Sequence, residues 1–330
     1  MRRIYTLIPF IFIFFIGRGQ DIHFTQYNLA PVTLNPALTG AFYGSFRIGA
    51  LYRSQFFNVD NFTAFKTPNL YIDAPIIKGF RDKDWVGVGA NIFQDEAGDL
   101  ELTFGSFLGS VAYHFALDKE GDAILTLGVQ GGTMSRRLVN EGAKKLIDDE
   151  TLPSENDNRN FFDLNAGLML RTPLGEMSLL EVGVAGFHLT GPDYNLRQNT
   201  AELPLRYDFH ARVKNYITET FTVTPSVLYK GMGTANQIAL QGMVGFQVDQ
   251  EKMIDLNMGL GYRINDLDAL EILFGLDWGD FKAGFGYDLA LTSLAGGSNS
   301  RPGAVEFAAS YIAKIYKKPD PKPTLFCPRF

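Results

Sequence analysis

The sequence is poor in the residues that build disulfides and metal sites. It holds one cysteine, Cys327, and four histidines among 330 residues. A single cysteine leaves an exported chain without an internal disulfide, and no cysteines or histidines stand at the spacing of zinc ligands. The sequence therefore predicts no metal site and no cofactor.

The sequence also lacks the motifs of common enzyme classes. It contains no nucleophile elbow, phosphate-binding loop or zinc-protease motif. The glycine-bearing stretches "GYRIND" (261–266) and "GFGYD" (284–288) are read as strands, whereas a phosphate-binding loop would lead into a helix. We therefore predict no catalytic residue and a protein that is not an enzyme.

Long apolar runs and blocks of one charge are absent as well. Beyond residues 4–16, no apolar run approaches the roughly 18 residues that a membrane-spanning helix needs. The net charge is −6, with both signs mixed along the chain, whereas a nucleic-acid-binding protein would show a concentrated basic patch. These absences exclude a helical membrane protein and argue against a nucleic-acid partner.

The first residues have the layout of a secretory signal peptide. Met1–Arg3 is positively charged, 4–16 ("IYTLIPFIFIFFI") is apolar, and Gly17 and Gly19 supply small residues before a cleavage site at Gln20. The apolar stretch is too short for a spanning helix. We predict a signal peptide over 1–19 and an exported chain; a retained N-terminal anchor is the alternative.

Strict alternation of apolar and polar residues dominates the rest of the sequence. In "LRYDFHARVK" (205–214), every second residue from Leu205 is apolar and the others are charged or polar. Successive strand side chains point to opposite faces, so a strand separates the two sets completely. Similar patterns predict about fourteen strands, at 45–53, 67–75, 84–93, 101–114, 122–134, 162–171, 178–190, 205–214, 220–230, 237–248, 254–263, 270–278, 281–289 and 305–314.

Two architectures fit this alternation. A soluble sandwich would bury its apolar face, whereas a transmembrane barrel would turn that face to lipid and its polar face to a lumen. Long connections on one side and tight turns on the other are typical of outer-membrane barrels. The predicted fold class is therefore all-β, an antiparallel transmembrane β-barrel of about 14 strands with an irregular N-terminal segment and a proline-rich C-terminal tail. The long connections would be 54–62, 136–160, 191–203 and 292–302, and the tight ones 172–177, 218–219, 249–252 and 279–280.

The polar faces of the strands would fill the lumen of such a barrel. Buried polar groups must pair, so we predict a cross-braced polar network rather than a wide channel. A catalytic role for His210 is the alternative to an ion-pair network around it. The predicted lumen network comprises Arg47, Arg53, Arg206, Asp208, His210, Arg212, Arg263 and Glu271.

The stretch after the leader, "QDIHFTQYNLAPVTLNPALTG" (20–40), is irregular but rich in distinctive residues. Together with Arg53 and Gln55, it resembles the PorP/SprF family of Bacteroidota, the outer-membrane proteins of the type IX secretion system and gliding machinery. The N-terminal family motif consists of Gln20, Asp21, Phe24, Gln26, Tyr27, Pro31, Asn35, Pro36 and Gly40.

The resemblance implies a location and a role. It implies an outer-membrane barrel that supports the secretion or surface anchoring of large proteins with a type IX C-terminal signal, such as gliding adhesins. It also implies partners among the secretion components, besides the outer-membrane lipid. The alternative function is a general outer-membrane channel for small solutes.

The chain is expected to have four segments. These are the signal peptide (1–19), an N-terminal segment at the periplasmic mouth or lumen (20–40), the barrel (41–316) and a C-terminal tail (317–330). An even strand number places both termini in the periplasm. Because prolines restrict the backbone, 20–40 would be ordered, either as a plug in the lumen or as a lead-in that caps the barrel.

Two further segments are candidates for partner contacts. The tail is proline-rich and would be extended, so its apolar residues would either dock onto the periplasmic machinery or fold back under the barrel. The connection 136–160 would either contact the secreted protein or remain a solvated loop. The candidate partner contacts in the tail are Leu325, Phe326 and Phe330.

Overall fold

The computed structural model describes residues 21–57, 63–78, 80–81, 83–97, 102–138, 158–194, 202–265, 268–291 and 303–315. The leader, the tail and most of the connection 136–160 lie outside the described residues. The described chain begins with three short helical turns, η1 (Tyr27–Leu29), α1 (Pro31–Leu34) and η2 (Pro36–Leu38). Among the described residues, no helix is long and apolar enough to cross a bilayer.

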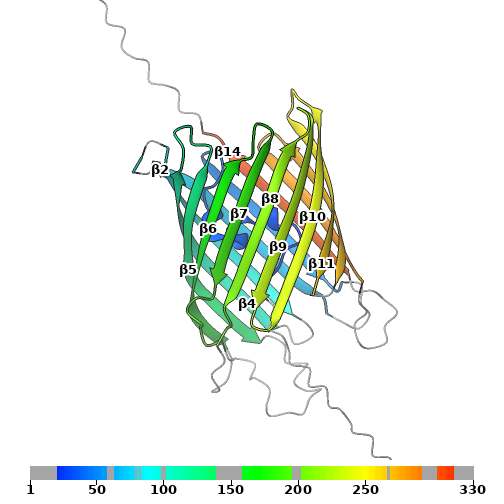
Figure 1. Ribbon diagram of the computed structural model, residues 1–330. Helices are drawn as coiled ribbons and strands as arrows, with labels where there is room; N and C mark the ends of the chain where they lie inside the picture. Colours follow the sequence, from blue (N-terminus) through cyan, green and yellow to red (C-terminus); the bar gives the residue numbers. More distant parts are fainter. Residues whose placement is uncertain are drawn as a thin grey trace, which may run out of the picture.

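The described residues form fourteen strands that close into one antiparallel barrel (Figure 1). Each strand pairs with its neighbours in the sequence, and β1 pairs with β14. Closure removes the free edges whose unpaired backbone groups could not be tolerated in hydrocarbon. The predicted fold class is confirmed. The strands are β1 (Phe46–Gln55), β2 (Phe65–Lys78), β3 (Trp85–Ala97), β4 (Leu102–Ala116), β5 (Ile124–Leu138), β6 (Asn158–Pro173), β7 (Ser178–Phe187), β8 (Arg206–Tyr216), β9 (Phe221–Met232), β10 (Ala235–Asp249), β11 (Ile254–Ile264), β12 (Ala269–Trp278), β13 (Phe281–Ala290) and β14 (Gly303–Ala313).

Alternation along the strands sorts side chains between the two faces of the wall. In β8, Tyr207 and Phe209 are 46% and 40% exposed on the outside, whereas Arg206 and Asp208 are buried inside. Polar side chains in the interior and apolar ones outside are the arrangement of a membrane barrel, not of a sandwich.

The connections differ between the two ends of the barrel. At one end, which we call the short-turn end, the strands are joined by 174–177, 217–220, 250–253 and 279–280. At the other, the long-loop end, the connections include 139–157, 188–205 and 291–302. The β9–β10 turn, Gly233 with Thr234, departs from this sorting because it is short but lies at the long-loop end. Residues 45 and 314, which flank the barrel, both lie at the short-turn end.

Candidate functional site

The N-terminal segment lies inside the barrel (blue in Figure 1) and runs along the lumen. Its first described residue, Asp21, contacts Arg206, which begins β8 at the long-loop end. Its far end reaches the short-turn end, where the indole Nε1 of Trp85 donates a hydrogen bond to the carbonyl of Gly40 over 3.0 Å. Residues 21–40 therefore traverse the lumen, and we call residues 21–45, which continue to the start of β1, the lumen segment.

Asp21 is held by two cationic partners near the long-loop end. Arg206 donates a hydrogen bond to its carboxylate, and Nε2 of His188 lies 3.1 Å from the same carboxylate. Burial alone would raise the pKa of Asp21, but Arg206 and His188 outweigh burial and hold the pKa well below its usual range. The other ring nitrogen of His188 lies 2.9 Å from Asp163.

The backbone at Thr25 and Gln26 is held by a buried charge cluster. Glu306 of β14 accepts hydrogen bonds from both backbone N–H groups, over 2.8 and 2.7 Å. Arg53 of β1 donates to the Thr25 hydroxyl over 2.8 Å and to Asp288 over 2.7 Å. All of these side chains are buried, and a buried charge is stable only when it is paired and hydrogen-bonded.

A second arginine extends this cluster. Arg263 of β11 pairs with Asp288 over 3.0 Å and contacts Nε2 of His23 over 2.6 Å. Burial lowers the pKa of His23 well below its usual value, and the positive charges of Arg53 and Arg263 lower it further. A neutral His23 can therefore accept the hydrogen bond that Arg263 donates.

The middle of the lumen segment is fixed by Asn35, which is completely buried. Its side-chain oxygen accepts from the N–H of Ala37 over 2.8 Å and caps η2. Its amide nitrogen lies 3.2 Å from the carbonyl oxygens of Leu168 and Val184, and 3.1 Å from Nε2 of His210. Asn35 thus ties the segment to three neighbouring strands.

Glycines in the wall make room for Asn35. A Cβ at Gly167 of β6 would lie 1.9 Å from Oδ1 of Asn35, and a Cβ at Gly183 of β7 would lie 2.2 Å from Nε2 of His210. Larger residues at these two positions would push Asn35 or His210 out of place. The glycines of the strands therefore shape the lumen as much as the charges do.

The segment leaves the lumen at a point where its backbone lies close to the backbone of β3. Gly40 has a φ of +69° and a Cβ there would lie 2.6 Å from Cα of Gly87 in β3, so only glycine fits. The N–H of Gly40 donates to Asp73 over 2.7 Å. Arg47 donates two hydrogen bonds to the same carboxylate, over 2.9 and 2.7 Å, and a third to the carbonyl of Leu38.

The structure places the residues of the N-terminal family motif inside the lumen, apart from Gln20, which lies outside the described residues. Asp21 contacts the wall through its carboxylate, as described above, and Tyr27 donates to the Ser226 hydroxyl over 2.9 Å. Burial raises the pKa of Tyr27 to about 12. The buried members of the motif are Phe24, Gln26, Tyr27, Pro31, Asn35, Pro36 and Gly40.

The eight residues predicted for the lumen network all lie on strands and contribute to separate clusters around the lumen segment. Arg53 and Arg263 share Asp288, and Glu271 lies 3.9 Å from Arg263. Arg206 contacts Asp208 over 3.2 Å as well as Asp21. The other three contact further groups: Arg47 with Asp73, His210 with Asn35, and Arg212 with Glu181.

Three residues that hold the segment were not singled out from the sequence. Glu306 carries a usable signal, because it occupies an inward position of its strand and stands opposite Arg53 in the β1–β14 register. Thr25 carries no such signal because it lies outside the alternating strands, and His188, although within the predicted strand 178–190, follows the end of β7 at Phe187. The candidate partner contacts Leu325, Phe326 and Phe330 lie outside the described residues.

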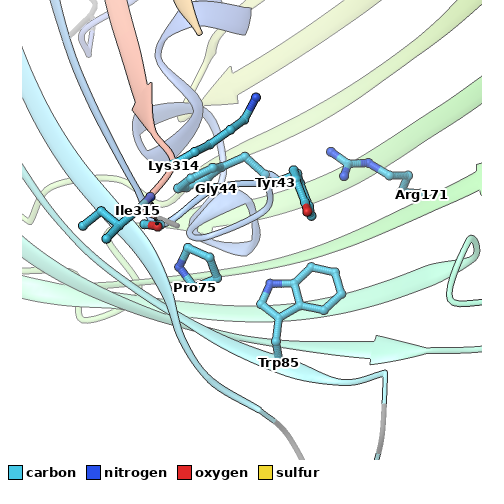
Figure 2. A pocket seen from close by; sticks show the side chains of 9 residues that line it. Tyr43, Gly44, Pro75, Trp85, Arg171, Lys314 and Ile315 are labelled. Atoms are coloured by element: carbon cyan, nitrogen blue, oxygen red, sulfur yellow. Dashed lines mark hydrogen bonds between the residues drawn. The ribbon is translucent and has the colours of Figure 1, made fainter. Parts of the chain in front are cut away.

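A cleft of about 490 Å³ opens at the short-turn end, beside the point where the lumen segment leaves the barrel (Figure 2). Tyr43 and Trp85 line it, and Tyr43 is 88% exposed. Its two cations already have partners, because Arg171 pairs with Glu181 over 2.6 Å and Lys314 with Asp280 over 2.5 Å. The cleft therefore presents an aromatic surface rather than an unpaired charge.

The arrangement has the character of a closed scaffold. Among the described residues, no group of three or more histidine, cysteine, aspartate or glutamate side chains is placed to hold a metal ion. The charged side chains described above contact one another and the backbone of the lumen segment. These contacts hold the lumen segment against the inner face of the wall.

Residues 16–311 match the family model described as "Type IX secretion system membrane protein PorP/SprF". Among curated proteins, none matches the chain. Solved structures with a similar fold include the CymD monoaromatic hydrocarbon channel, with a TM-score of 0.57, 10% identity, and coverage of 88% of this chain and 93% of that one. The toluene transporter TodX of Pseudomonas putida has a TM-score of 0.51 and 10% identity, with coverage of 85% and 92%. The likeness to these structures concerns the fold.

Proposed function

Because the chain belongs to the PorP/SprF family of type IX secretion system membrane proteins, we propose that it is a non-enzymatic outer-membrane barrel that docks partner proteins. Its partners would be components of the secretion system and a large secreted or surface-anchored protein with a C-terminal signal, such as a gliding adhesin. The observation that carries this proposal is the lumen segment, which occupies the interior that a conducting protein would leave open.

The lumen segment crosses the interior from the long-loop end to the short-turn end. A cavity beside Asp21, His188 and Arg206 measures about 20 Å³, which is the size of a site for one water molecule. A polypeptide would have to displace the lumen segment to pass through the barrel. Support for secretion by this barrel would therefore come from its surfaces and not from transport through its lumen.

The cleft at the short-turn end is the surface that best fits a docking role. Both chain ends of the barrel lie on this side, and we propose that this side faces the periplasm. Exposed aromatic side chains such as Tyr43 are typical anchors in protein interfaces. We propose that a periplasmic component of the secretion system contacts the cleft around Tyr43 and Trp85.

Two measurements test the proposed function. In planar bilayers, the purified protein is expected to show no steady ion conductance. From detergent-solubilised outer membrane, the tagged protein is expected to capture a secretion component or a large secreted protein. Tyr43→Ala is expected to reduce that capture. Tyr207→Ala, at an exposed position on the outer wall, is the control and is expected to leave the capture unchanged. Steady conductance without any captured partner would contradict docking.

A channel for small solutes is the second candidate function. The observation that favours it is the fold shared with CymD and TodX, which are described as a hydrocarbon channel and a toluene transporter. Uptake of a small aromatic solute into liposomes that contain this protein would support this function. The occupied lumen argues against it.

A further inference from the structure

The outer face of β2–β6 carries a candidate site away from the lumen. Cross-strand register arranges the outward side chains of this wall in rows. Near the long-loop end, one row is polar or small, and the next row toward the short-turn end is mainly apolar. The first row holds Gln94, Gly105, Ser135 and Asn160, and the second holds Leu70, Ile92, Phe107, Thr133 and Phe162.

A groove of about 520 Å³ crosses the boundary between these rows. Gly105 forms its floor between Gln94 and Ser135, because glycine has no side chain to fill the space. The lining includes the hydroxyl groups of Thr133 and Ser135 and the side chain of Asn160. The groove thus offers hydrogen-bond donors at the depth where the polar and apolar parts of the wall meet.

On the short-turn side of the groove the wall is open at Gly109, whereas Gly131 is covered in part, because a Cβ there would lie 3.2 Å from the Phe162 ring and 3.4 Å from Cδ1 of Leu164. Gly109 and Gly131 face each other across β4 and β5 in the next row. A Cβ at Gly109 would meet nothing closer than the carbonyl oxygen of Gly131 at 3.9 Å. Phe107 and Phe162, each 59% exposed, stand on either side of Thr133 and border this apolar trough.

The charge at the rim of the groove nearer the long-loop end favours the binding of an anionic group. One row further toward the long-loop end, Arg137 is exposed and its cross-strand neighbours are the uncharged Thr103 and Asn158. The acid in that row, Glu96, faces Lys66 and accepts a hydrogen bond from Gln94 over 2.6 Å. Arg137 therefore supplies a positive charge two residues from the Ser135 hydroxyl, on the same face of β5.

We propose that this groove binds one membrane lipid with an anionic, phosphate-bearing headgroup. The headgroup lies over Gly105, with Ser135 and Arg137 as donors, since hydrogen bonds from arginine to phosphate are among the strongest in proteins. One acyl chain lies over Gly109, between Phe107 and the Phe162 ring that covers Gly131 in part. The occupant is a lipid because the groove opens on the outside of the barrel and continues into the apolar, lipid-facing part of the wall.

Native mass spectrometry of the purified full-length protein in mild detergent tests this site. The probes are phosphatidylglycerol and a diacylglycerol with the same acyl chains but no phosphate. The protein is expected to retain one phosphatidylglycerol and no diacylglycerol. Arg137→Gln is expected to weaken phosphatidylglycerol retention about tenfold, the loss of about one charge-assisted hydrogen bond.

The matched pair of filling variants is Gly109→Leu and Gly242→Leu. Gly242 faces outward on β10, and a Cβ there would meet no atom within 4 Å, so its substitution controls for an added outward leucine. Gly109→Leu is expected to abolish retention and Gly242→Leu to leave it unchanged, with Thr133→Phe as a second filling variant should Gly109→Leu fail to fold. Equal retention in the pair, equal retention of both probes, or a protein bound on this wall in place of lipid would overturn the proposal.

Discussion

The two ends of the lumen segment differ in how the chain attaches them to the barrel. At the short-turn end, Gly40 packs against Gly87, and the Thr39 hydroxyl lies 2.9 Å from that of Ser110. At the long-loop end, buried pairs of opposite charge dominate, with Asp21 on Arg206 and Glu306 on the backbone of Thr25 and Gln26.

This difference follows from how the segment is attached. At the short-turn end the chain continues directly into β1, so the segment stays attached even where its contacts with the wall, including Asp73 on the N–H of Gly40, are lost. At the long-loop end, no described strand of the barrel precedes Asp21, and among the described residues side chains of the wall keep the segment in place. The charge clusters therefore hold in place the end of the segment that could dissociate from the wall. Substitutions at the two ends should have different consequences.

The largest effect is expected from Arg53→Met at the long-loop end. The substitution leaves Glu306 buried beside Thr25 without its arginine and removes one of the two arginines of Asp288. Breaking a buried pair by removing one partner costs about 3–5 kcal/mol. We expect a lower melting temperature of the barrel. We also expect new ion conductance in planar bilayers, because the half of the lumen segment near the long-loop end is released from the wall.

An exposed ion pair provides the control for Arg53→Met. Lys282 pairs with Asp277 over 2.7 Å, and their side chains are 41% and 28% exposed. Removing such a pair costs roughly 1 kcal/mol or less, so Lys282→Met should change neither the melting temperature appreciably nor the conductance. If Arg53→Met showed no ion conductance, the charges at the long-loop end would not be what holds the segment in place.

A smaller effect is expected from Gly87→Ala at the short-turn end. The added methyl group would lie 2.2 Å from the carbonyl oxygen of Thr39, and overpacking of this kind costs about 1–3 kcal/mol. We expect a lower melting temperature but no conductance, because β1 still tethers the segment. Gly242→Ala on the outer wall is the matched control, and conductance in Gly87→Ala would remove the distinction between the two ends.

The barrel wall was predictable from the sequence because its physics is local. Alternation in stretches such as 205–214 specifies both the strand and the face that meets lipid. The observed strand ends differ from the predicted ones by a few residues, as in β6, which begins at Asn158 rather than at Phe162. The family motif indicated where a special segment lies.

The contacts of the lumen segment could not be predicted, because they join residues far apart in the chain. Nothing in the sequence relates Asn35 to Gly167 and Gly183, which it meets on two neighbouring strands only after the barrel has formed. The role of His188 is similarly hidden, because it follows the last residue of β7 and meets Asp21 from the other end of the chain. Such partners depend on the stagger of the whole barrel.

The smallest effect is expected from pH, acting on His188 at the long-loop end. Burial would lower the pKa of His188, but its hydrogen bonds to Asp163 and Asp21 outweigh burial and raise the pKa to about 9. A raised pKa contributes stability that is fully present below about pH 6.5 and is lost as the pH rises toward 9. The lowered pKa of Asp21 affects stability only below about pH 4, where its carboxylate becomes protonated. We therefore expect the melting temperature to fall between pH 6.5 and pH 9, and the fall to be modest because Arg206 still holds Asp21. In His188→Gln this fall is expected to disappear. The same fall in both proteins would assign it to another group.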